Sequence, residues 1–183
     1  MSSVPDGPAP DTRITELTAT LSAWRVVVLD AAADLGADRP EVQSQSSRLE
    51  SPTAVFEFLD FFVDFFLRTA VDVGRLSDEI VSNATRQHAG MLRQLAQASV
   101  EAQRRSVMFR DKWINRPLPY EQVRPLLTRI SSLSRDTLAS YRELETAADA
   151  LEQILGAPAP PPAPGERLDR RALFNRLLRR NEQ

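Results

Sequence analysis

The chain offers one histidine and one stripe of carboxylates as candidate catalytic or metal-binding groups. His88 is the only histidine, and there is no cysteine. Metal sites built from several imidazoles or from thiolates are therefore excluded. A di-iron helical enzyme would need Glu-x-x-His pairs, whereas the residues before His88 read Thr85-Arg-Gln. A serine–histidine–acid site stays formally open. Because the spacing places His88 in a helix packing seam, we interpret it as a structural or surface residue.

The carboxylates lie at helical spacing in the middle of the chain. Glu57, Asp60, Asp64 and Asp72 would share one narrow stripe of a helix, and Arg68 interrupts it. A divalent cation would need a second acidic cluster to complete its oxygen shell, and none is close in sequence. We interpret the stripe as the solvated edge of an otherwise buried helix rather than as a cation site or an acid–base pair.

Other ligand-binding signatures are missing from the sequence. The six glycines are scattered, so neither a phosphate-binding loop nor a dinucleotide fingerprint is present. The arginines near residue 183 alternate with leucine rather than with stacking aromatic residues, and the rest of the chain is acidic. We therefore expect no cofactor, no metal, no nucleic-acid partner and no enzymatic activity. A helical-bundle enzyme using His88 with a carboxylate is the least favoured class.

The stretch 53–73 is the most unusual part of the sequence, because six of the eight phenylalanines are there. Five charged residues within it make a transmembrane span unfavourable. As a helix, it would be apolar on most sides and would have to be covered by a helical core, an oligomer seam or an apolar non-protein surface. We take its phenylalanines as a candidate apolar interaction face: Phe56, Phe58, Phe61, Phe62, Phe65 and Phe66.

Hydrophobic periodicity predicts an all-α body over residues 11–156. A heptad seam indicates a helix over 12–36, and residues 37–50 read as a polar loop with room for one helical turn. Ser51-Pro52 would begin a helix over 52–114, with Gly74 as its weak point, and a last helix is expected over 120–155. These helices could form elongated antiparallel coiled-coil-like hairpins or close into a four-helix bundle.

The two ends differ from this body. Residues 1–10 read as a disordered arm, and 157–165 as a proline-rich spacer of polyproline II type. Residues 166–183 carry a net charge of +3 and leave −5 on the rest of the chain. They predict a short basic amphipathic helix. Its candidate docking residues are Leu173, Phe174, Leu177 and Leu178 on the apolar face, with Arg171, Arg176, Arg179 and Arg180 around the other.

Together these features predict a non-enzymatic scaffold or adaptor. We expect it to form a homo-oligomer and to dock on a membrane surface, a protein shell or a protein partner through 166–183. The start of the chain has no secretory pattern, so we expect it to be cytoplasmic, or peripheral to a membrane or an intracellular body. The alternative is a coat protein that uses helix 53–73. Cysteine-free helical segments with an exposed apolar face are similar in plan to phasins on polyester storage granules, a similarity that involves no shared motif.

Overall fold

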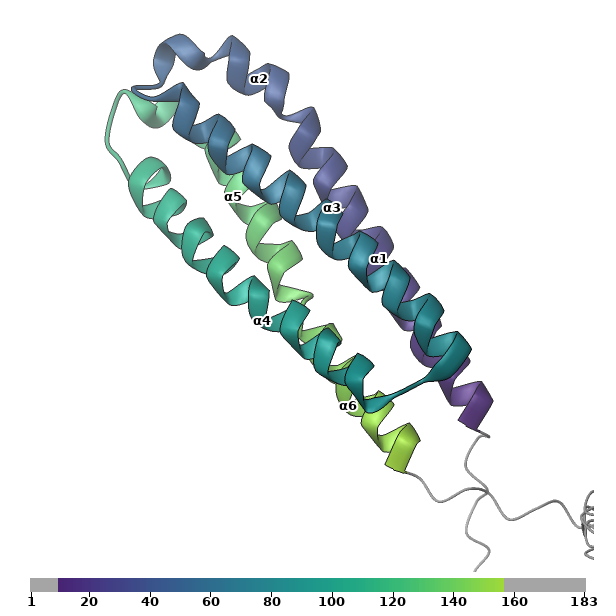
Figure 1. Ribbon diagram of the computed structural model, residues 1–183. Helices are drawn as coiled ribbons and strands as arrows, with labels where there is room; N and C mark the ends of the chain where they lie inside the picture. Colours follow the sequence, from purple (N-terminus) through teal and green to yellow (C-terminus); the bar gives the residue numbers. More distant parts are fainter. Residues whose placement is uncertain (1–9, 157–183) are drawn as a thin grey trace, which may run out of the picture.

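A computed structural model describes residues 10–156, and every regular element in that range is helical (Figure 1). The predicted all-α fold class is thus confirmed. The main helices are α1 (Pro10–Ala37), α3 (Pro52–Asn83), α4 (Arg86–Phe109), α5 (Arg124–Ala139) and α6 (Arg142–Gly156). The connections hold α2 (Arg39–Ser44), 3-10 turns at Ser46–Arg48 and Tyr120–Gln122, and a π-helical turn at Arg110–Ile114.

Helices α1 and α3 form an antiparallel pair. The Arg25 side chain lies so near Gly74 that a β-carbon there would be 3.1 Å from its Cζ atom. Just beyond the end of α1, Arg39 at the start of α2 forms an ion pair with Asp60 of α3. Both contacts fit one register. Buried residues of α1 at alternating spacings of three and four, among them Leu21, Trp24, Val28 and Leu35, face the core as the heptad pattern predicts.

Aromatic side chains fill the space between α3, α4 and the junction of α5 with α6. Phe62 and Phe66 are fully buried, and the ring of Phe58 stacks on Phe109 of α4 with centroids 3.9 Å apart. Phe65 stacks on Tyr141, which lies between α5 and α6, at 5.6 Å. The phenylalanines of α3 therefore build the interior of this single chain.

Helix α4 packs on α5 and α6 through a stripe of small residues. Arg93 of α4 forms ion pairs with Asp149 at 2.7 Å and with Glu152 at 2.6 Å, which sets the register of α4 against α6. The indole N–H of Trp24 donates to the carbonyl oxygen of Ser140 at 3.1 Å and so ties α1 to the junction of α5 and α6. The buried small residues of α4 are Ala89, Ala96, Ser99, Ala102 and Ser106.

The chain breaks at a different place from the one the sequence suggests. The helix predicted over 52–114 passes through Gly74 without interruption, ends at Asn83 and resumes at Arg86. A mid-helix glycine costs only about 1 kcal/mol, and its neighbours Val73 and Leu76 are buried on the core side. At Ala84 and Thr85 the backbone is extended instead, with φ −136° and ψ 160° at Thr85.

Two other segments also differ in detail from the expectation. The stretch predicted as a loop over 37–50 contains α2, whose Val42 is buried. The helix expected over 120–155 is divided near Ser140, where a turn separates α5 from α6. The first predicted helix, 12–36, is observed over Pro10–Ala37.

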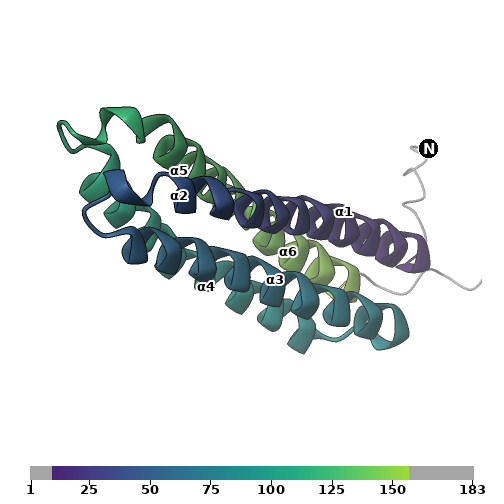
Figure 2. The same cartoon turned by 90° about the horizontal axis from the view of Figure 1, so that it is seen from above.

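The molecule is elongated, and its two ends are distinct (Figure 2). One end, called here the base, holds the start of α1, the α3–α4 connection and the last turn of α6 (Figure 1). The opposite end, called the tip, holds α2 and the connection that follows Arg110–Ile114 (Figure 1). The 32 residues of α3 give a length of about 48 Å at roughly 1.5 Å per residue. Within residues 10–156, no helix combines the length and the apolar character that crossing a membrane requires.

Candidate functional site

The structure divides the predicted apolar interaction face into two sets. Phe58, Phe62 and Phe66 are buried among the chain's own helices. The other three, Phe56, Phe61 and Phe65, are partly buried against the same core. The division follows helical geometry, since positions 58, 62 and 66 share one side of α3. An apolar surface available to a partner can therefore include only the second set while the helices stay closed.

Phe61 borders a groove between the first turns of α3 and the last turns of α4, near the tip. This tip groove has a volume of about 690 Å³. The buried side chains of Phe58, Phe109 and Trp113 form its floor. Met108, which is 70% exposed, stands on its rim. Because these three rings are buried, the apolar surface that the groove offers comes from Met108 and the partly buried Phe61. Such a surface suits the apolar face of an amphipathic helix.

The rim of the tip groove carries charges of both signs. The guanidinium of Arg105 lies over the Phe61 ring, with its Cζ atom 4.0 Å from the ring centroid. The ammonium of Lys112 lies 5.1 Å from the Trp113 ring. The carboxylates on this rim are Glu57, Glu101 and Asp111. The groove thus combines apolar contact with places for charged partners and contains no histidine or nucleophilic hydroxyl for acyl or phosphoryl transfer.

A cluster of polar and aromatic side chains fixes the tip beside this groove. The hydroxyl of Tyr120 donates to Glu50 at 3.1 Å, and Arg116 forms an ion pair with the same carboxylate. The hydrogen bond from Arg116, followed by that from Tyr120, holds the pKa of Glu50 below its ordinary value. The guanidinium of Arg116 also lies over the rings of Trp113 and Tyr120, at 5.5 and 5.6 Å. Leu118, 72% exposed, projects from the loop that this cluster holds.

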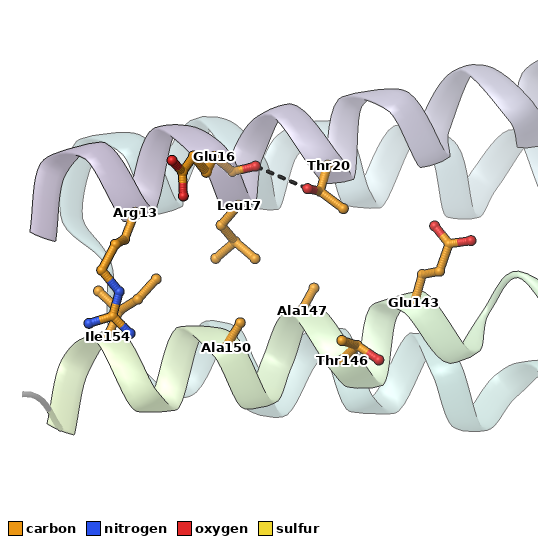
Figure 3. A pocket seen from close by; sticks show the side chains of 9 residues that line it. All are labelled: Arg13, Glu16, Leu17, Thr20, Glu143, Thr146, Ala147, Ala150 and Ile154. Atoms are coloured by element: carbon orange, nitrogen blue, oxygen red, sulfur yellow. Dashed lines mark hydrogen bonds between the residues drawn. The ribbon is translucent and has the colours of Figure 1, made fainter. Parts of the chain in front are cut away.

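A second groove lies near the base, between α1 and α6 (Figure 3). Figure 3 shows Leu17 of α1 facing Ala147 and Ala150 of α6, with Arg13 beside Ile154 where α6 ends. Its volume is about 330 Å³, and Leu17, Ala147 and Ile154 are already buried. This base groove therefore offers little apolar surface to a partner.

His88 lies at the start of α4 and supports the local fold. Its Nδ1 atom accepts a hydrogen bond from the backbone N–H of Thr85 at 3.2 Å, and its Nε2 atom lies 3.5 Å from Glu79. This is the reciprocal half of a capping box, with histidine in the place usually held by glutamate or glutamine. The neutral ring must then carry its proton on Nε2, facing Glu79.

The acidic stripe of α3 is engaged in surface ion pairs. Among residues 10–156, no group of three or more histidine, cysteine, aspartate and glutamate side chains could hold a metal ion. Exposed pairs of this kind contribute little to stability. The pairs are Asp60 with Arg39, Asp64 with Arg68 and Asp72 with Arg75.

The predicted docking residues of 166–183 and the proline-rich stretch 157–165 lie outside the described residues. The tip groove has no signature in the amino-acid sequence. Met108 and Arg105 had no distinguishing pattern, and their proximity to Phe61 depends on how α3 and α4 fold together. The Pro117-Leu-Pro119 run was the one visible signal of a constrained loop at the tip.

Comparison with known proteins adds no family to this description: no family model, curated protein or solved structure matches the chain.

Proposed function

We propose that the protein is a non-enzymatic helical adaptor that docks on a membrane surface, a protein shell or a protein partner through residues 166–183. In this proposal the body is a four-helix bundle with coiled-coil-like seams, in which α5 and α6 together act as the fourth rod. The body self-associates, and the segment that follows Gly156 provides attachment.

One observation carries the proposal. The phenylalanines of α3, the strongest apolar feature of the sequence, are largely used inside the chain, with Phe62 and Phe66 fully buried. The basic amphipathic pattern of 166–183 then stands as the strongest apolar feature that the described core does not use. The four large apolar residues on its predicted apolar face would give weak attachment singly, so several copies acting together favour an oligomer.

The coat-protein reading has narrower support. Phe56, Phe61 and Phe65 are partly exposed, so a strip of α3 could touch an apolar surface. Phe58, Phe62 and Phe66 could join it only if the helices opened, which would expose the core. We therefore place this reading second.

Localisation in cells tests the two readings against each other. Residues 157–183 fused to a fluorescent protein should concentrate at the envelope or in discrete bodies, and the tagged chain lacking 166–183 should become diffuse. Leu177→Asp in the fusion should abolish its localisation, whereas Asn175→Asp, off the apolar face, should not. A diffuse fusion together with a still-localised truncated chain would reject attachment through 166–183 and favour the α3 surface.

A further inference from the structure

The tip groove has an occupant available in the same chain. Its exposed rim residue Met108 and the partly buried Phe61 leave apolar surface uncovered, and its volume of about 690 Å³ is about twice that of the base groove. Residues 166–183 supply four large apolar side chains on one predicted helical face. The groove therefore matches the apolar face of this segment better than the base groove does.

Charge favours the same pairing. Three carboxylates, Glu57, Glu101 and Asp111, stand on the groove's rim against two cations, Arg105 and Lys112, so the rim carries an excess of one negative charge. The segment brings arginines on both sides of its apolar residues. Arginine–carboxylate pairs are the geometry that such a rim would form. Arg105 would have to turn away from the Phe61 ring, and a single exposed cation–π contact is a weak obstacle.

The length of the intervening chain is also suitable. The ion pair of Arg93 with Glu152 places Gly156 level with the first turn of α4, near residue 89. The groove begins at Glu101 and reaches Phe109 and beyond, so it lies about 18–30 Å farther along α4 at roughly 1.5 Å per residue. In the polyproline II conformation that the sequence predicts, at about 3.1 Å per residue, residues 157–165 would span about 28 Å. Residues 166–172 add the further reach needed to cross α4 before Leu173.

We propose that residues 166–183 dock in the tip groove of their own chain, with Leu173, Phe174, Leu177 and Leu178 against Phe61 and Met108. A tether that can span this distance gives an effective concentration on the order of millimolar, so a contact with a Kd below that concentration would be mostly occupied. The proposal rests on the proposed function and adds its regulation: an external surface or partner must compete with the groove for the same apolar face.

Spin labels on the full-length protein test this contact. The chain has no cysteine, so Thr53→Cys at the start of α3 and Asn175→Cys in the segment give two unique labelling positions. Labelled protein is diluted with an excess of unlabelled protein, and the distance distribution is measured by pulsed electron–electron double resonance. Docking within one chain predicts a narrow, short distance that survives dilution.

Two matched substitutions on α4 provide the control. Met108→Arg places a positive charge in the groove, which repels the arginines of the segment. It should replace the narrow distance distribution by a broad one at longer distances. Val100→Arg makes the same change at another exposed position of α4, outside the groove, and should leave the narrow distance intact. Circular dichroism of each variant checks that the helices are unchanged.

Three results would overturn the contact. These are a broad distribution in the parent protein, a narrow distance that Met108→Arg does not alter, and a narrow distance that disappears on dilution. The last would assign the segment to the groove of a second copy. None of them affects the localisation of the fusion that carries residues 157–183 without the body, so the two proposals fail separately.

Discussion

His88 shows how a side chain suited to chemistry can be explained by its structural contacts. It is the only histidine, its side chain is 12% exposed, and both ring nitrogens face a group of the protein. The Nδ1 atom accepts a hydrogen bond from the backbone N–H of Thr85, the N-cap residue of α4, and the Nε2 atom faces the carboxylate of Glu79 in α3. The residue therefore joins the end of one helix to the start of the next.

Substitution of His88 separates this role from a catalytic one. His88→Ala removes the acceptor for the Thr85 N–H and should lower the free energy of unfolding by about 1 kcal/mol, the usual cost of a lost cap. His88→Gln keeps an acceptor at the same sequence spacing and should restore most of that loss. Urea unfolding of both variants, with Gln87→Ala at the exposed neighbouring position as the control, measures the difference. Full stability in His88→Ala, combined with loss of cellular function, would contradict the capping role and favour a chemical one.

The helices show what periodicity can and cannot predict. A helix with one apolar stripe, such as α1, shows its buried face in the sequence, because only one arc of it is hydrophobic. Helix α3 is apolar around most of its circumference, so the sequence could not separate Phe62, which is buried, from Phe61, which borders a groove. That distinction depends on where α1 and α4 pack against α3, which no local pattern contains.

In helix α4 it is the small residues that leave the buried side undetermined by the sequence. The spacing of small residues predicts a buried seam through Ala98, Ala102 and Ser106. Ala102 and Ser106 are buried, but Ala98 is exposed and the neighbouring Ser99 is buried instead. Alanine and serine occur on both the buried and the exposed sides of this helix, so hydrophobicity alone cannot identify the buried side. The ion pairs of Arg93 with α6 are tertiary contacts that define it in the structure.

Gly74 gives a direct test of the continuous α3. Because the helix is uninterrupted there, Gly74→Ala should raise the free energy of unfolding by up to about 1 kcal/mol through helix propensity. The new β-carbon would meet only the far end of the flexible Arg25 side chain, at 3.1–3.2 Å, and that side chain can move. Thermal unfolding measures the change, and Gly90→Ala, where a β-carbon would meet nothing within 4 Å, is the matched control in α4. A large destabilisation at position 74 alone would mean that the close approach of Arg25 is rigid.

At the scale of the whole molecule, the two ends of the described body carry different features. The base holds the last turn of α6, where the described residues end at Gly156, and the tip holds the tip groove and the loop that exposes Leu118. An adaptor with this plan can present one surface at the tip while it is attached near the base. The contacts of Glu50 with Arg116 and Tyr120 fix the loop beside this groove at the tip.

The Glu50 cluster predicts how the tip responds to acid. Hydrogen bonds from Arg116 and Tyr120 hold the pKa of Glu50 below the ordinary value of 4.5, so the fold favours the ionised carboxylate. The resulting stabilisation is complete above that ordinary value and is lost as the pH falls through the lower pKa of the folded state. The hydrogen bond from Arg93 lowers the pKa of Glu152 in the same way, so the protein loses further stability in the same pH range. Glu50→Gln should therefore reduce the melting temperature at pH 7 and should also make it less sensitive to acidification than that of the parent protein.

The decisive comparison is the change in melting temperature between neutral and acidic pH, measured by circular dichroism for the parent, Glu50→Gln and Glu145→Gln. Glu145 is an exposed residue of α6, so its substitution should leave the acid response of the parent unchanged. Because the Glu50 carboxylate is itself exposed, the pair is partly screened, and the neutral-pH effect should be small and should shrink with added salt. An acid response of Glu50→Gln equal to that of the parent would mean that the Arg116 and Tyr120 contacts do not hold the carboxylate ionised. The tip would then be held by its other contacts, among them the packing of Trp113 against Tyr120 and the hydrogen bond from Arg124 to the carbonyl oxygen of Arg116.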